Sequence, residues 1–369
     1  MLRKIARKTL KLVGVERPME CLALFQHKIL GKHFFWSDFP RCIQIDISNY
    51  CGQKYSGIMC EYCFPQHSIA CGKDTYSEMP LKWIEWIILQ FNKYGSGKPS
   101  DPYKSACAEF VTFFLNGDGL TDPRLPEVAK MQKKLAPWLN NQTFTCGANP
   151  QNAQWLCIPE LDWVNFTVSA HNRELYRQVH GGDKFEAALK SMKYVSEHAP
   201  EKTKLEVHFV ITERNIAYMK DWYEFMHTNF PRFRKVFSPL VASTTNTWSI
   251  KALGNLTLEK EEIAIQEVNP HSKFWNPEST EVKQPCVLWN NFSIKSDLTL
   301  LQCCNWADPA TWNYGKLPDI VNMGLDLRDI WQMRLANKQN NPLCASCNLK
   351  HPKWRNRLNA IQITTKIGR

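Results

Sequence analysis

The run Cys42–Tyr50 (CIQIDISNY) leads directly into the segment Cys51–Phe64 (CGQKYSGIMCEYCF), and this junction decides the fold. The first run is mostly apolar and is typical of a β-strand. The second segment contains glycine and polar residues, which predict a loop. It also carries three cysteines, Cys51, Cys60 and Cys63. We therefore expect three thiols in the loop that follows the first strand.

The number of cysteines in this loop is informative, because it is three and not four. A [4Fe–4S] cluster held by three thiolates leaves one iron without a protein ligand, and that iron can bind a small molecule. The Cys60-x-x-Cys63 pair alone would also suit a zinc knuckle or a redox pair. Tyr62 between these cysteines, Phe64 after them and the strand before them favour the cluster. Structural zinc and free core thiols are the alternatives.

On these residues the chain resembles the radical S-adenosylmethionine (radical SAM) superfamily, whose usual signature is C-x3-C-x2-C after the first strand of a partial barrel. The chain departs from this signature, since eight residues separate Cys51 from Cys60. Residues 54–58 (KYSGI) within that interval fit a longer loop. The resemblance implies that Cys51, Cys60 and Cys63 hold a [4Fe–4S] cluster whose open iron binds S-adenosylmethionine (SAM).

Size and composition suit a globular protein with metal centres. The chain has 369 residues, of which 44% are hydrophobic, and a net charge of +11. Its 14 cysteines are about 4% of the residues, well below a disulfide scaffold, and their C-x2-C pairs favour metal. Iron–sulfur ligation needs reduced thiols, which predicts a cytoplasmic protein. We find no apolar run near the roughly 18 residues of a membrane span.

Residues 1–13 have the pattern of a basic amphipathic helix. Such a helix either packs its apolar stripe on the rest of the protein or lies peripherally on an anionic membrane surface. The segment lacks the apolar centre of a signal peptide. The apolar face holds Leu2, Ile5, Ala6, Leu10 and Val13, and the basic face holds Arg3, Lys4, Arg7, Lys8 and Lys11.

Strand-like and helical segments alternate between residues 42 and 241. Alternating strands and helices predict a parallel sheet with helical crossovers. Six such units fit the partial (β/α)6 TIM-like barrel that the resemblance implies, with its chemistry at the carboxyl ends of the strands. The expected strands are Cys42–Ser48, Phe110–Leu115, Thr143–Cys146, Trp163–Ser169, Leu205–Ile211 and Val236–Val241. The expected helices are Leu81–Tyr94, Arg124–Leu135, Lys184–His198 and Ala217–Asn229.

The second strand leads into Asn116–Pro126 (NGDGLTDPRLP), where the family reads G-G-E-P or G-E-P. The resemblance places Gly117, Asp118 and Gly119 in that position and implies that they bind the methionyl group of SAM. Glycine permits close approach of the backbone, and a carboxylate beside the ammonium group would help to fix it. The alternative is an ordinary turn at a strand end, for which Asn-Gly and Asp-Gly are common.

Three more strand ends carry polar residues. The resemblance implies that Ser169 contacts the SAM ribose, with a turn cap as the alternative. Cys146, in Thr143–Gly147 (TFTCG), replaces the asparagine of the family's T-N-G, so its role is open. His208 is more typical of a hydrogen-bonded core histidine than of a catalyst. Residues 176–185 resemble the family's loop and the start of its next helix.

The C-terminal part holds a second group of cysteines. Asp297–Cys304 (DLTLLQCC) resembles the D-G-x-V-x-x-C hairpin of SPASM and twitch auxiliary domains, with Leu298 in the place of the glycine. Residues 329–331 (DIW) and Cys344-Ala345-Ser346-Cys347 follow in the family's order. The resemblance implies an auxiliary [4Fe–4S] cluster with no open iron, and four-cysteine zinc is the alternative. Its expected ligands are Cys286, Cys303, Cys344 and Cys347, with Cys304 in reserve.

We thus expect an α/β chain with five regions. They are a basic N-terminal helical extension (1–40), a radical SAM partial barrel (41–242), a connector (243–283), a small cysteine-rich auxiliary-cluster module of SPASM or twitch type (284–355) and a C-terminal tail (356–369).

The resemblance implies a radical SAM enzyme with two [4Fe–4S] clusters, reduced by a partner such as flavodoxin or ferredoxin. It would cleave SAM reductively to a 5′-deoxyadenosyl radical, which abstracts a hydrogen atom from the substrate. We favour a peptide or protein substrate, with the auxiliary cluster assisting. One alternative is dehydrogenation or epimerisation of a small molecule of sugar or aminocyclitol type. Another is a non-enzymatic, metal-stabilised nucleic-acid-binding protein, which the charge allows but which would not need two cysteine groups.

Overall fold

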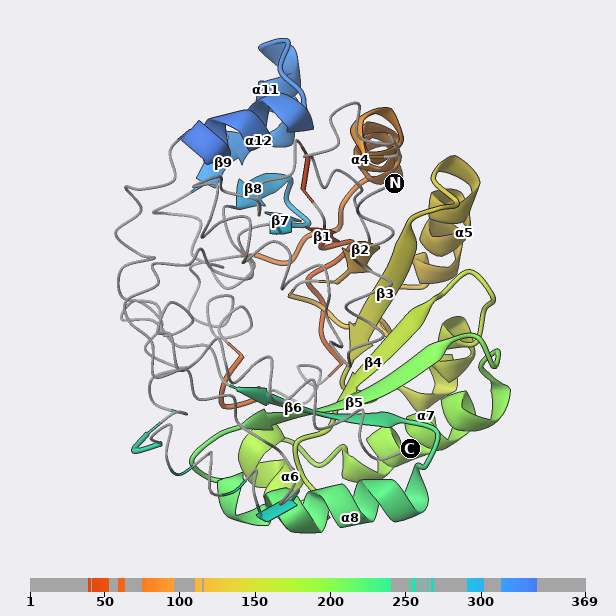
Figure 1. The fold of residues 1–369 in the computed structure, drawn as a ribbon, viewed down its shortest axis with the longest axis vertical. Helices are drawn as coiled ribbons and strands as arrows, with labels where there is room; N and C mark the ends of the chain where they lie inside the picture. The colour runs from red at the N-terminus through yellow and green to blue at the C-terminus, as the bar shows by residue number, and fades with distance from the viewer. Residues whose placement is uncertain are drawn as a thin grey trace, which may run out of the picture.

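The computed structural model describes residues 39–40, 42–52, 59–63, 75–95, 110–114, 116–239, 291–301 and 313–336, with scattered positions between 252 and 268. Their strands form one nine-stranded mixed sheet in the order β6-β5-β4-β3-β2-β1-β7-β8-β9. Figure 1 shows this sheet as an arc with β6 near one end and β9 near the other. The fold is therefore mixed α/β, as expected.

The first six strands are parallel and adjacent in chain order. This arrangement confirms the expected parallel sheet, and it brings the carboxyl ends of the strands to one edge. Within the described ranges the sheet is open, because β6 and β9 are its edges. The strands are β1 (Cys42–Ile45), β2 (Phe110–Phe113), β3 (Asn140–Thr145), β4 (Trp163–Thr167), β5 (Lys204–Ile211) and β6 (Arg234–Pro239).

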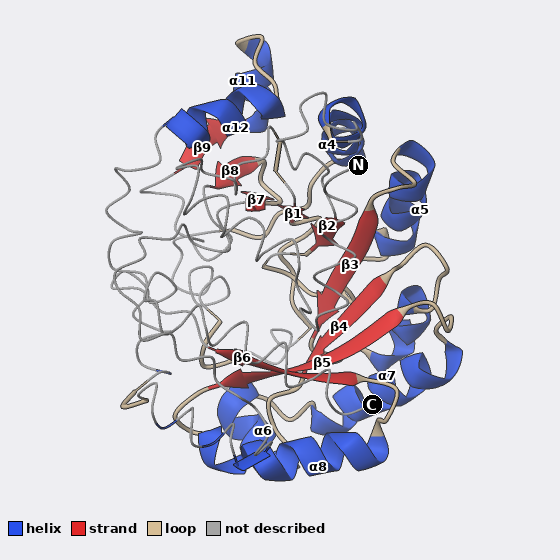
Figure 2. Cartoon of the chain, viewed as in Figure 1, coloured by secondary structure: helices blue, strands red, loops and turns tan. Residues whose placement is uncertain are grey.

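Helices cover the outer face of the arc (Figure 2). They are α4 (Leu81–Tyr94), α5 (Leu125–Leu135), α6 (Arg173–His180), α7 (Phe185–His198) and α8 (Met219–Asn229), with 3-10 turns η2 (Pro150–Leu156) and η3 (Ile216–Tyr218). The alternation of buried residues along strand β5 explains why the helices lie on that face. Its residues Leu205, Val207, Phe209 and Ile211 are buried, and the Phe209 ring packs 5.0 Å from that of Trp222 in α8. The intervening residues of the strand face the other side of the sheet.

Three strands extend the sheet beyond β1. Strand β7 (Asn291–Ile294) pairs parallel with β1, and β8 (Thr299–Leu301) and β9 (Asn313–Lys316) follow antiparallel. Helices α11 (Leu317–Asn322) and α12 (Leu327–Ala336) come next. The loop before α12 contacts α4, since the Tyr94 hydroxyl donates to the Asp326 carboxylate. The described part of the expected auxiliary module therefore continues the parallel sheet beyond β1.

Several elements differ from their expected bounds, and helix α6 was not expected. Strand β3 begins at Asn140, three residues early, because the buried Asn141 amide bonds with the Gln132 side chain at 2.7 Å and so tolerates burial. Strand β6 begins at Arg234. Residues 176–180, expected in a loop, belong to α6, which the Asn172 side chain caps by accepting from the Leu175 N–H at 2.9 Å.

Several expectations lie outside the described residues. Residues 1–13, most of the connector and the tail are among them, so the domain boundaries and the membrane-surface contact stay predictions. None of the helices in the described ranges is long and apolar enough to cross a membrane.

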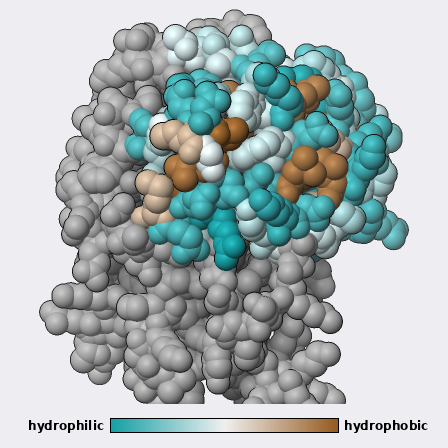
Figure 3. Space-filling model, turned by 90° about the horizontal axis from the view of Figure 1, so that it is seen from above, coloured by the Kyte–Doolittle hydropathy of each residue, from teal (hydrophilic) through white to brown (hydrophobic). Residues whose placement is uncertain are grey.

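Exposed hydrophobic residues are scattered over the described surface. In Figure 3 hydrophobic residues form small separate patches among hydrophilic ones on the face shown. Isolated exposed hydrophobic side chains of this kind are normal in globular proteins. The larger ones are Leu89, Trp138, Tyr194, Tyr218, Met323 and Met333.

Candidate functional site

The loops after β1 and β2 are bound tightly to each other. The buried Asp46 carboxylate accepts the backbone N–H groups of Asn116 at 3.0 Å and Gly117 at 3.3 Å. A Cβ atom on Gly117 would lie 2.0 Å from the Ser48 carbonyl oxygen and 2.9 Å from that of Tyr50. Position 117 must therefore be glycine, because the chain that leads to Cys51 passes too close to leave room for a Cβ atom.

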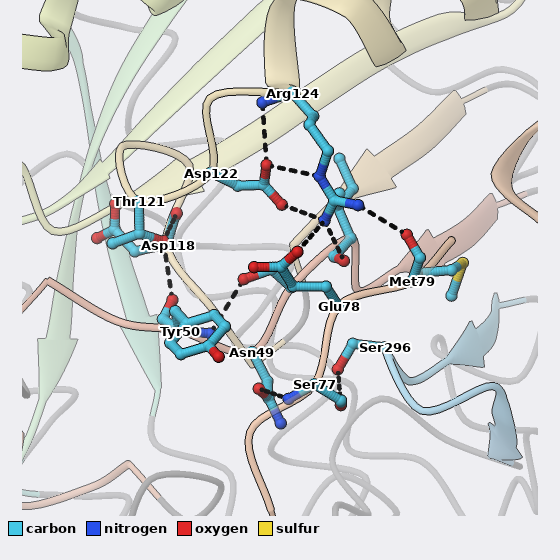
Figure 4. A network of polar contacts seen from close by, with 12 residues as sticks. Asn49, Tyr50, Ser77, Glu78, Met79, Asp118, Thr121, Asp122, Arg124 and Ser296 are labelled. Atoms are coloured by element: carbon cyan, nitrogen blue, oxygen red, sulfur yellow. Dashed lines mark hydrogen bonds and ion pairs between the residues drawn. The ribbon is translucent and has the colours of Figure 1, made fainter. Parts of the chain in front are cut away.

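A second set of contacts holds the same junction from the side of α5 (Figure 4). The Tyr50 carbonyl accepts the Asp118 N–H at 2.9 Å and the Thr121 hydroxyl at 3.0 Å. Arg124 forms a forked pair with Asp122, at 2.9 and 2.6 Å. Its guanidinium also donates to the carbonyls of Ile47 and Met79. One arginine thus fixes the strand end that precedes the cysteines.

The hairpin of β7 and β8 reaches this junction as well. The Asn49 side chain bonds with the Ser77 N–H at 2.9 Å and with the Thr75 carbonyl at 2.8 Å. The Ser77 hydroxyl lies 2.7 Å from that of Ser296, in the turn of the hairpin (Figure 4). The C-terminal hairpin therefore lies at the same end of the sheet as the cysteine loop.

The three predicted thiols lie near enough for their charges to act on one another, but their sulfurs do not form a group within 4.8 Å among the described residues. Cys51, Cys60 and Cys63 are half-buried. The Cys63 N–H donates to the Cys60 carbonyl at 3.0 Å, which closes a tight turn. Burial, and then negative charge on Cys63 and Cys51, raises the pKa of the Cys60 thiol well above its usual value. Three thiolates in one loop would repel one another and would be stabilised by a shared cation, so the donor set fits a three-thiolate metal centre.

Asp118 is buried, and protein groups occupy its carboxylate. One oxygen accepts the Leu120 N–H at 2.8 Å and the Thr145 hydroxyl at 2.7 Å. The other accepts the N–H and the thiol of Cys146, at 2.7 and 2.8 Å. The carboxylate therefore joins the loop after β2 to the end of β3. The expected contact with SAM stays a prediction.

The sulfur of Cys146 lies near that of Cys51. The sulfurs of Cys51 and Cys146 and an Asp118 oxygen lie within 4.8 Å of one another. A hydrogen bond with Cys51, burial and the charge of Asp118 raise the pKa of Cys146 well above its usual value. In this arrangement the Cys146 thiol donates to the Asp118 carboxylate. Its position at the strand end was predictable from the sequence, but this role was not.

Gly119 also lies where a side chain would not fit. Its N–H donates to the Phe144 carbonyl at 2.9 Å, and a Cβ atom would lie 2.6 Å from the Thr143 hydroxyl. The two glycines of the predicted SAM motif are thus needed for packing against β1 and β3. Their contact with SAM is a prediction.

Ser169 follows β4 and is fully buried. Its hydroxyl accepts the Val210 N–H at 2.9 Å, and its carbonyl accepts from the Asn215 side chain at 3.2 Å. Its own N–H donates to Nε2 of His180 at 2.9 Å. These contacts agree with the capping alternative for Ser169, and its contact with ribose stays a prediction.

His180, at the end of α6, is a site residue that sequence reasoning missed. It is fully buried, and its Nδ1 lies 3.3 Å from the sulfur of Cys60. Burial lowers the pKa of His180 to about 3, so the ring is neutral. The sequence contained one signal, because Asn172 and Gly181 are the cap residues of a helix that ends at this histidine.

The auxiliary cysteines, Cys286, Cys303, Cys304, Cys344 and Cys347, lie outside the described residues. The hairpin before them is described. Leu298 has φ +70°, the left-handed conformation that favours the glycine of the family motif. Asp297 accepts the Thr299 N–H at 3.0 Å and pairs with Lys316 at 2.6 Å. Leu298 thus has a conformation that glycine favours, and the place of this turn in a D-G motif stays a prediction.

Comparison with known proteins supports the fold. No protein-family model matches the chain, and no curated protein matches it in sequence. The chain is similar to a structure of Streptococcus suis SuiB bound to S-adenosylmethionine, with a TM-score of 0.55 and 13% identity over 90% of this chain and 74% of that one. A second SuiB structure gives 0.56 and 16%, over 94% and 81%. At these identities the likeness shows that the chain has the fold of SuiB.

We expect Gly117→Ala to destabilise the protein by about 3 kcal/mol, at the upper end for overpacking, because its Cβ would meet backbone. Gly324→Ala is the matched control. Gly324 has φ +76°, and a Cβ atom added there would meet nothing within 4 Å, so only about 1–2 kcal/mol of backbone strain is expected. Denaturant unfolding measures both variants. If Gly117→Ala lowers the free energy of unfolding less than Gly324→Ala does, the contact between the loops after β1 and β2 has room for a Cβ atom, which would contradict this prediction.

We expect Asp118→Asn to lower the free energy of unfolding by about 1–3 kcal/mol for each buried donor that it leaves without an acceptor. Asparagine presents one acceptor oxygen where four donors converge. The control is Asp183→Asn at an exposed position, where loss of the ion pair with Arg173 should change stability by no more than about 1 kcal/mol. Equal stability of Asp118→Asn and the wild type, by denaturant unfolding, would contradict the hydrogen-bond network.

Proposed function

We propose that the chain is a radical SAM enzyme. The observation that carries this proposal is the loop after β1 that contains Cys51, Cys60 and Cys63, in a fold shared with a SuiB structure that has SAM bound. Three thiolates would hold a [4Fe–4S] cluster with one open iron. Such a cluster supplies the electron that cleaves SAM to methionine and a 5′-deoxyadenosyl radical, which then takes a hydrogen atom from the substrate.

The chain's own part is to hold this site rigid and partly shielded from water. Asp46 and Arg124 hold the segment that leads to Cys51, because Asp46 binds the backbone of the loop after β2 and Arg124 binds the Ile47 carbonyl after β1. Asp118 holds the neighbouring loop in shape. In this proposal Gly117, Asp118 and Gly119 bind SAM mainly through the backbone of their loop, because the Asp118 carboxylate already has four internal donors. Ser169 supports the wall formed by α6.

The proposal includes an auxiliary [4Fe–4S] cluster on Cys286, Cys303, Cys344 and Cys347. It is supported by the conformation of Leu298, which fits the hairpin motif. It is further supported by the contact of Ser296 with Ser77, which joins the hairpin to the carboxyl end of β1. Electrons would come from a flavodoxin or ferredoxin, and a cytoplasmic location follows from the need for reduced thiols.

For the substrate we propose a peptide or protein, on the family resemblance of the auxiliary module. A small polar substrate of sugar type is the second candidate, and one observation favours it. On the face of β5 opposite the helices, Glu206 lies 3.3 Å from His208, and it also pairs with Arg234. These groups give that face of the sheet donors and acceptors suited to hydroxyl groups.

We expect the wild-type protein, reconstituted without oxygen, to carry about eight irons per chain, and the Cys51→Ala, Cys60→Ala, Cys63→Ala triple variant about four. The triple variant should form no 5′-deoxyadenosine from SAM with dithionite. Cys157→Ala is the control, because Cys157 is a half-buried thiol outside the group and its loss should leave the iron unchanged. A triple variant that keeps all its iron would refute the proposed cluster site.

We expect Cys344→Ala to lose about four of the roughly eight irons while SAM cleavage continues. The reason is that residues 291–301 are held by β1 as well as by the second cluster, and the first three thiols lie elsewhere. Iron analysis and 5′-deoxyadenosine yield, measured with SAM and dithionite alone, test this. Loss of all iron would mean that the auxiliary module and the barrel depend on one another to fold, and unchanged iron would remove Cys344 from the ligands.

A further inference from the structure

We propose that His180 donates an Nδ1–H hydrogen bond to the sulfur of Cys60 and so raises the reduction potential of the cluster that Cys60 helps to hold. The inference rests on the proposed function, since it concerns a cluster ligand. It gives a role to a buried histidine that neither the cysteine motif nor the SAM motif contains.

The backbone fixes which ring nitrogen carries the proton. The Ser169 N–H points at Nε2 of His180 across 2.9 Å. A backbone amide can only donate, so Nε2 accepts and has no proton of its own. The proton of the neutral ring is therefore on Nδ1, which faces the Cys60 sulfur at 3.3 Å. The contact is an N–H···S hydrogen bond directed at the ligand.

The ring is held in this orientation by its surroundings. Tyr176 stacks on it with ring centroids 4.2 Å apart and an interplanar angle of 17°, and Tyr62 meets it edge-on at 6.0 Å. The Glu61 N–H donates to the Val179 carbonyl at 2.9 Å, which fastens the cysteine turn to the last turn of α6. These contacts hold the His180 ring beside Cys60.

A donor in this position favours the reduced cluster. Reduction adds negative charge, part of which lies on the cysteine sulfurs, and a hydrogen bond to sulfur stabilises that charge. His180 is fully buried, so little water competes with the bond. The potential should be higher with the histidine than without it, which eases electron transfer from the reducing partner.

The test compares variants of the full-length protein by redox titration of the cluster EPR signal, without SAM. His180→Phe keeps the ring volume and loses the donor, so its midpoint potential should shift to a more negative value. His180→Gln can accept from Ser169 and donate to Cys60, and its shift should be smaller. His198→Phe is the matched control, because His198 is exposed on α7 and should leave the potential unchanged.

A His180→Phe protein with a full cluster and an unshifted potential would overturn the inference while leaving the proposed function in place. If that variant does not fold, wild-type protein labelled with [15N]histidine decides the matter. Pulsed EPR of its reduced cluster should show a histidine 15N coupling, and the lack of one would overturn the inference. A wild-type chain that binds no iron–sulfur cluster would overturn the proposed function and this inference together.

Discussion

The contact between the loops after β1 and β2 is the constraint on which the rest of the site depends. The parallel register of these strands brings their carboxyl ends side by side, but register alone does not set the distance between the loops. Gly117, without a Cβ atom, lets the second loop lie against the Ser48 carbonyl, and Asp46 binds it there. The cysteine segment begins at this contact between the two loops. Its position therefore depends on how their backbones pack.

Hydrogen bonds of buried polar groups then link the ends of successive strands. Asp118 joins the loop after β2 to the end of β3. Ser169 joins the end of β4 to β5 and to α6, and His180 at the end of α6 returns to Cys60. Each of these groups would be costly to bury alone, and each is satisfied by a neighbour on the next element. The shape of the site therefore depends on a chain of hydrogen bonds that crosses the sheet edge.

The sequence predicted the elements whose patterns are local and strong. Helix α4 has the expected bounds, because its apolar residues repeat at helical spacing and Pro80 and Gly95 flank it. Strand β3 was placed late, because Asn140 and Asn141 look like loop residues until the partner of Asn141 is known. Helix α6 was missed because it is short and polar, although its cap residues were present in the sequence.

Within the site, the sequence predicted the three cysteines through their spacing and the preceding strand. It could not show that the Asp118 carboxylate is occupied, because its donors on β3 lie 27 and 28 residues away. Nor could it link His180 to Cys60, which is 120 residues distant. Such pairings arise only when parallel strands align their ends. Short-range patterns therefore identify candidate ligands, whereas tertiary packing decides which groups surround them.

The central claim is that the three thiols leave one iron open to SAM. Pulsed EPR of the reduced protein with SAM labelled with 15N at its amino group and 17O at its carboxylate tests this most directly. We predict hyperfine couplings from both labels that are strong enough to require direct coordination to iron. An EPR signal that is unaffected by the labelled SAM, or a site that binds zinc and forms no cluster, would contradict the account.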